Sequence, residues 1–198
     1  IHAYGATKTL EELKALIEHA SPSHPVLTGM IHGDLHATNV LVRMNDAVII
    51  DLERVQTSMP LLFDVASLEG GLFVDGFIAD RRSAKEVLGS LKPLYTATAF
   101  DRDDHHCPPE DGSAWFVDSV RQIRMQARQL EREPRQYGWT LAAVLLKKAC
   151  NCKDFQKVGE DRAADATPLT REAVRALAYV LAERILVALS GEGDSPAP

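Results

Sequence analysis

The sequence predicts an α+β fold that is mainly α. Two short β-branched runs, residues 40–42 and 47–50, flank the turn pair Asn45-Asp46, and this pattern is typical of a β-hairpin. In the rest of the chain the apolar residues recur at helical spacing instead. We therefore expect one small hairpin followed by a helical subdomain.

The helices are expected from their capping residues and apolar stripes. Before the hairpin, residues 9–20 carry Thr9 as N-cap and Glu12 at the capping-box position. After it, the helix candidates are residues 62–78 (with an interruption at Gly70-Gly71), 83–98, 113–132, 137–150 and 170–190. Thr170 is a suitable N-cap for the last of them. Residues 1–190 thus form one predicted domain, and residues 191–198 form a polar tail or linker.

Composition limits the class of protein. With 198 residues, 45% of them hydrophobic, the chain suits one globular domain. The net charge of −6 gives no basic footprint, so we expect no nucleic acid as a partner. The sequence has no apolar run long enough for a membrane span and no signal peptide. Three cysteines without a disulfide framework favour a reduced, cytoplasmic setting.

Three polar residues around the hairpin suggest a specific chemistry. Asn39 precedes the first predicted strand and Asp51 follows the second. Paired strands lie roughly 5 Å apart, so both side chains should reach the same end of the hairpin. Asp34 lies in the preceding loop. Phosphoryl transfer requires a carboxylate that accepts the proton of the attacking hydroxyl. It also requires an amide oxygen and a second carboxylate that bind Mg²⁺.

The same segment resembles a known superfamily. His32-Gly33-Asp34-Leu35-His36-x-x-Asn39, followed by Ile50-Asp51-Leu52-Glu53, is similar to the catalytic and metal-binding loops of the aminoglycoside phosphotransferase and choline kinase superfamily, relatives of the protein kinases. The resemblance covers residues 30–68. It implies the C-terminal lobe of a protein kinase-like fold.

The resemblance also implies a role for each matching residue. Asp34 would be the catalytic base, and Asn39 and Asp51 would be the Mg²⁺ ligands. Four further residues would support them: His32 as a structural histidine that braces the loop, His36 within the loop motif, Glu53 beside the metal, and Asp64 as an anchor from the following helix. Asp64 is the second Asp of a DPxxDLA-like segment, whose first Asp is absent here.

The implied reaction moves the γ-phosphoryl group of ATP or GTP to a hydroxyl of a small molecule, with Mg²⁺ as cofactor. Only about thirty residues precede the catalytic loop, and they contain neither a glycine-rich phosphate loop nor a Val-Ala-x-Lys strand. We therefore expect the N-terminal lobe to be absent or truncated, and no phosphotransfer by this polypeptide alone. The alternative is a catalytically inactive kinase-like binding or signalling module. The expected partners are a nucleotide, a small-molecule acceptor and any further domains of the same gene product.

A row of arginines suggests a second feature. Arg121, Arg124, Arg128, Arg132 and Arg135 recur at helical spacing, which is typical of a solvated face paired with nearby acidic groups. The functional alternative is that Arg124 and Arg128 bind an anionic acceptor, because the guanidinium fork matches phosphate and carboxylate. Such an acceptor would differ from the cationic aminoglycosides.

Two metal-site interpretations fit less well. Gly33-Asp34-Leu35-His36 also resembles the opening of two-metal phosphoesterases, but their downstream Asp and Asn-His segments are missing, and Asn39 and Asp51 would have no role. A zinc site built from His105-His106-Cys107, Cys150 and Cys152 lacks the usual Cys pair spacing.

Overall fold

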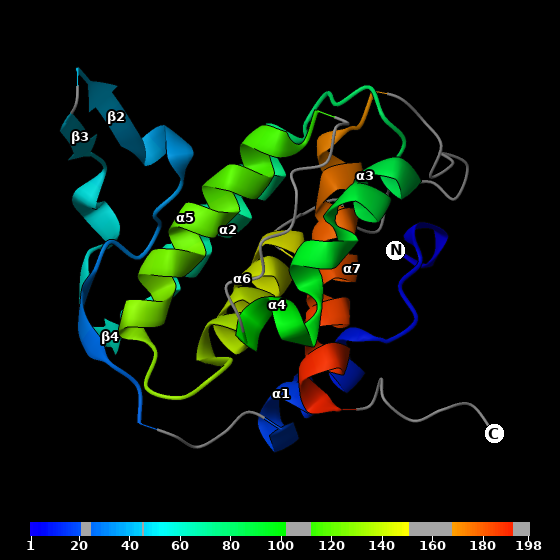
Figure 1. Cartoon of the computed structure of the whole chain (residues 1–198), viewed down its shortest axis with the longest axis horizontal. Coiled ribbons are helices and arrows are strands. Elements are labelled where there is room, and N and C mark those ends of the chain that lie inside the picture. The colour runs from blue at the N-terminus through cyan, green and yellow to red at the C-terminus, as the bar shows by residue number, and fades with distance from the viewer. Residues whose placement is uncertain (21–24, 45, 102–111, 151–167, 192–198) are drawn as a thin grey trace.

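The computed structural model describes residues 1–20, 25–44, 46–101, 112–150 and 168–191. Most of these residues are helical, and the strands among them form two-stranded antiparallel ribbons. Figure 1 shows the helices gathered in one bundle, with the ribbons along one edge of it. The predicted α+β, mainly α class is therefore confirmed.

The bundle is made of helices of unequal length. The α-helices are α1 (Leu10–Ala20), α2 (Leu62–Gly76), α3 (Ala84–Leu91), α4 (Ala97–Asp101), α5 (Ala114–Leu130), α6 (Gln136–Cys150) and α7 (Arg171–Ser190). The 3-10 helices are η1 (His2–Tyr4), η2 (Ala37–Asn39), η3 (Leu52–Arg54) and η4 (Lys92–Tyr95). Among the described residues, no helix is both long enough and apolar enough to cross a membrane.

The capping signals in the sequence mark real helix starts. The Thr9 hydroxyl accepts the backbone N–H of Glu12 at 3.3 Å, and the Glu12 carboxylate accepts that of Thr9 at 2.6 Å. Thr170 accepts the N–H of Ala173 at 3.2 Å at the start of α7. The predictions at residues 9–20 and 170–190 are therefore confirmed. The predicted tail beyond residue 191 lies outside the described residues, as do residues 105–107 and 152 of the disfavoured zinc alternative.

Helix α7 is the centre of the hydrophobic core. Its predicted apolar stripe is buried throughout, with exposures from 0% to 9% at Val174, Leu177, Leu181, Ile185 and Leu189. Helices α6 and α2 pack beside it, together with three aromatic side chains that contact one another: Phe73, Phe77 and Phe116. This single core holds the elements that support residues 32–39, called the candidate catalytic loop below.

Two predicted helices differ from the structure. Helix α2 continues through Gly70 and Gly71 without the expected interruption. The glycines instead allow close packing, because a Cβ on Gly71 would lie 2.8 Å from Cβ of His36. The predicted helix at residues 83–98 is wrong in its second half. Pro93 cannot donate a backbone hydrogen bond, and the chain turns there into η4 before α4 begins.

The predicted hairpin is confirmed as strands β2 (Val40–Arg43) and β3 (Asp46–Ile49), which pair with Val40 opposite Ile49. Asn45 of its turn lies outside the described residues. A second ribbon, β1 (Thr28–Ile31) with β4 (Gln56–Pro60), was not predicted. It leads directly into the candidate catalytic loop on one side and into α2 on the other.

Candidate active site

The candidate catalytic loop begins with a turn that requires glycine. Gly33 has a φ of +81°, and a Cβ at this position would lie 2.3 Å from the carbonyl oxygen of Arg54. The loop after β1 therefore packs directly against the backbone of η3. Only a residue without a side chain permits this approach.

Asp64 holds this turn from the first helical turn of α2. Its Oδ2 accepts the backbone N–H of His32 at 2.5 Å, and its Oδ1 accepts that of Gly33 at 3.0 Å. A carboxylate at a helix N-terminus is also favoured by the helix dipole. The two hydrogen bonds attach the start of the candidate catalytic loop to the helical bundle.

The buried ring of His32 connects the loop to the end of the hairpin. Its Nε2 donates to the carbonyl of Ile50 at 2.8 Å, and its Nδ1 accepts the backbone N–H of Asp34 at 3.3 Å. A carbonyl needs a donor and an N–H needs an acceptor, so the ring is the neutral tautomer with its proton on Nε2. One side chain thus sets the distance between the segments that carry Asp34 and Asp51.

Asn39 lies at the same junction. Its carbonyl accepts the backbone N–H of Ile50 at 2.9 Å, and its side-chain Nδ2 donates to the carbonyl of Asp34 at 3.1 Å. The side chain is buried, with 6% of the residue exposed. Because the amide nitrogen is engaged, the amide oxygen is the atom that could reach a cation.

Asp51 and Glu53 follow the hairpin on the solvent side. Asp51 has left-handed backbone angles, φ 59° and ψ 59°, as it leads into η3. This conformation is uncommon for a residue with a Cβ, and it clusters at functional sites. Glu53 is exposed within η3.

The predicted ligands, an amide oxygen and a carboxylate, are of the type that Mg²⁺ prefers. Among the described residues, no three His, Cys, Asp or Glu side chains come close enough to enclose an ion. Mg²⁺ needs few protein ligands, because it keeps waters and takes oxygens from phosphate groups. The Asn39 amide oxygen and the Asp51 carboxylate suit that mode of binding.

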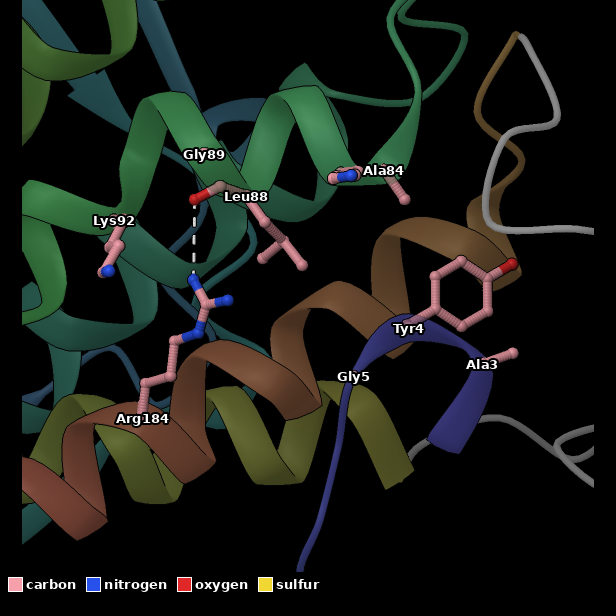
Figure 2. Close-up of a pocket in the computed structure, with 9 residues that line it drawn as sticks. Ala3, Tyr4, Gly5, Ala84, Leu88, Gly89, Lys92 and Arg184 are labelled. Atoms are coloured by element: carbon pink, nitrogen blue, oxygen red, sulfur yellow. Dashed lines mark hydrogen bonds between the residues drawn. The ribbon is translucent and has the colours of Figure 1, made fainter. Parts of the chain in front are cut away.

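Asp34 borders both solvent and a small hollow. Its side chain is 38% exposed, and its Oδ2 lies 3.3 Å from Nη1 of Arg54, which is itself 64% exposed. The hollow has a volume of about 240 Å³ and is lined by Asp34, His36, Val74, Asp75, Lys148, Arg171 and Arg175. A larger hollow of about 450 Å³ lies elsewhere, between η1, α3 and α7 (Figure 2). No predicted site residue lines that one.

The arginine row is a partly solvent-facing surface, with Arg132 exposed and Arg121 half-buried, and the expectation is corrected at Arg124. Its guanidinium is buried and donates to both Glu69 oxygens, from Nη2 at 2.7 Å and from Nε at 3.1 Å. Arg124 and Arg128 border a cavity of only about 10 Å³, which is too small for an acceptor. Arg121 pairs with Asp118, and Arg135 with Asp101.

Residues 6–152 match the family model described as "Ternary complex associated domain 9". The chain belongs to this family. The matched segment contains the candidate catalytic loop, the hairpin and α2, whereas α7 lies outside it. No curated protein and no solved structure matches the chain.

Sequence reasoning missed the cations of the small hollow. Lys148 lies on α6, and Arg171 and Arg175 lie on α7, far from Asp34 in the sequence. Neither helix carries a motif around these residues. Only the packing of α2, α6 and α7 brings these three cations close to the candidate catalytic loop.

Proposed function

We propose that this domain supplies the catalytic base and the metal ligands of a Mg²⁺-dependent phosphotransferase. Its reaction would move the γ-phosphoryl group of ATP or GTP to a hydroxyl of a small molecule, and its fold would be the C-terminal lobe of a kinase-like enzyme. The main support for this proposal is a pair of hydrogen bonds at Ile50. Its carbonyl accepts a hydrogen bond from the His32 ring, and its N–H donates to the carbonyl of Asn39. This junction supports a fixed arrangement of Asp34, Asn39 and Asp51.

Asp34 would accept the proton of the attacking hydroxyl. Its carboxylate is partly exposed, so an acceptor can approach it. The contact with Arg54 is a solvent-exposed ion pair, and such pairs contribute little and are easily displaced. Catalysis would then depend on positioning and on neutralisation of charge.

The amide oxygen of Asn39 and the carboxylate of Asp51 would hold the metal. When bound, Mg²⁺ neutralises charge on the nucleotide phosphates and orients them for in-line transfer. Glu53 adds a carboxylate two residues beyond Asp51. A reduced, cytoplasmic setting belongs to the same proposal.

A second candidate is a kinase-like binding module without turnover. Exposed apolar side chains on the ribbons favour it, among them Met30 (71% exposed), Val42 (75%) and Met44 (89%). Exposed apolar side chains that gather in one patch often mark a protein contact. The family description also refers to association with a ternary complex. In this second role, the acidic residues would be retained without transfer chemistry.

Phosphoryl transfer from radiolabelled ATP and GTP tests the proposal. The complete gene product that carries this domain would be assayed with Mg²⁺ and a panel of small hydroxyl compounds. We expect Asp34→Asn to lower the rate by about 10²–10⁴-fold, the usual contribution of a general base. Asp46→Asn, at the other end of the hairpin, is the matched control and should leave the rate unchanged. Transfer that survives Asp34→Asn, or no transfer in the wild type, would overturn the proposal.

A further inference from the structure

The small hollow beside Asp34 has an excess of positive charge. Lys148, Arg171 and Arg175 line it against two carboxylates, those of Asp34 and Asp75. Asp75 is exposed to solvent on α2. The chain as a whole has a net charge of −6, so this concentration of cations is a local feature.

The cations of the hollow are incompletely paired. The Nε of Arg175 is buried and has no hydrogen-bond partner among the described residues. Burial lowers the pKa of Lys148, although Asp75 and Asp34 oppose that effect. A buried donor without an acceptor is unfavourable, because it has lost water and gained nothing in return. Both observations indicate that an anion would complete this hollow.

The position and size of the hollow limit what that anion can be. At about 240 Å³ it is smaller than a typical pocket for a whole drug-sized ligand, which is roughly 300–1,000 Å³. It therefore suits a single small group of a larger molecule. Arg171 is the first residue of α7, so the positive end of that helix dipole lies at the same place.

We propose that this hollow binds an anionic group of the acceptor, so that the acceptor is a hydroxyl compound bearing a phosphate or a carboxylate. The description of this ligand as an acceptor rests on the proposed function. Guanidinium groups match both anions through two parallel hydrogen bonds. Asp34 lines the same hollow, so a hydroxyl close to the anionic group would come within reach of its carboxylate.

Binding of inorganic phosphate and of acetate, without nucleotide or Mg²⁺, tests this directly. Each anion would be titrated by NMR into the wild type, Arg171→Ala and Arg175→Ala, with folding checked by thermal unfolding. We expect each variant to bind about tenfold more weakly, as for the loss of a charge-assisted hydrogen bond. The anion that binds with the higher affinity indicates whether the group on the acceptor is a phosphate or a carboxylate. Arg171→Ala guards against a folding defect, because Arg171 is exposed at the start of α7.

Lys85→Ala is the matched control. Lys85 is an exposed cation that lines the larger hollow, and its loss should leave anion affinity unchanged. Three results would overturn the inference: no binding by the wild type, binding by the Arg171 and Arg175 variants as tight as by the wild type, or an equally large loss of affinity in Lys85→Ala.

Asp34→Asn separates this inference from the proposed function. Removal of a negative charge from the hollow should preserve or strengthen anion binding, whereas the proposed function requires Asp34→Asn to lower the transfer rate by about 10²–10⁴-fold. If Asp34→Asn keeps both anion binding and phosphoryl transfer, the anion site is supported but Asp34 is not the catalytic base. Loss of anion binding in Asp34→Asn would contradict the inference itself.

Discussion

Asp64 accepts the backbone N–H of His32 at 2.5 Å, and this bond joins the first turn of α2 to the candidate catalytic loop. The second carboxylate oxygen of Asp64 accepts the N–H of Gly33 at 3.0 Å. His32 and Gly33 are both buried, so neither N–H can turn to solvent instead. The position of Asp34, the next residue, therefore depends on a side chain thirty residues further along the chain.

Asp64→Ala should destabilise the domain by about 1–3 kcal/mol, because it leaves two buried donors without an acceptor. Asp75→Ala, an exposed change on the same helix, should stay within about 0.5 kcal/mol of the wild type. Urea unfolding of both variants measures the difference. Equal stabilities would show that the loop does not depend on Asp64.

Gly33→Ala should lower the free energy of unfolding by more than about 2 kcal/mol, because its φ of +81° is strained for alanine and the new Cβ meets the Arg54 carbonyl. The matched control is Gly89→Ala in α3, where a Cβ has no neighbour within 4 Å. That change should stabilise the domain by up to about 1 kcal/mol, since alanine favours a helix interior. Opposite signs of the two effects in denaturant unfolding would support the turn geometry; the same sign would contradict it.

Arg124→Met should lower the free energy of unfolding by about 3–5 kcal/mol, because it leaves the buried charge of Glu69 without its partner. Burial alone would lower the pKa of Arg124, but Glu69 raises it, so the guanidinium stays charged. Adding Glu69→Met to Arg124→Met should recover part of the loss. Arg121→Met, on the same helix and partly exposed, is the control. A double variant no more stable than Arg124→Met would contradict this account of the pair.

The sequence predicts the local parts of the fold well and the long-range parts poorly. Capping at Thr9 and Thr170 involves residues three apart, so the pattern carries the information. Strands β1 and β4 are only four and five residues long and pair across the whole hairpin, so neither gives a periodic signal. Arg124 shows the same limit, because its burial depends on Glu69, which lies 55 residues away.

The candidate site divides in the same way. Asp34, Asn39 and Asp51 lie within eighteen residues and could be read as one motif. Lys148 and Arg175 lie on separate helices, and only the packing of those helices brings them to Asp34. The anionic acceptor considered for Arg124 and Arg128 is thus proposed instead for a different set of cations.

Anion binding should weaken as pH rises toward the pKa of Lys148. Burial lowers this pKa from the ordinary value of 10.5, so the ammonium is lost at a lower pH than in an exposed lysine. Sulfate keeps its charge across this range, and its affinity should therefore begin to fall below pH 10.5 in the wild type. Lys148→Arg keeps the charge and should remove this pH dependence. Identical pH profiles for the two proteins would exclude Lys148 from the anion site.

The central claim is that this domain supplies the metal ligands of a phosphotransferase. Its most direct test is the affinity of the complete gene product for Mn²⁺–ATP, measured by electron paramagnetic resonance. Asp51→Asn removes the proposed carboxylate ligand while asparagine still tolerates the left-handed backbone at this position. The account predicts binding by the wild type, binding at least about tenfold weaker in Asp51→Asn, and no change in the hairpin control Asp46→Asn. Equal affinity in the wild type and Asp51→Asn, or no binding by the wild type, would contradict it.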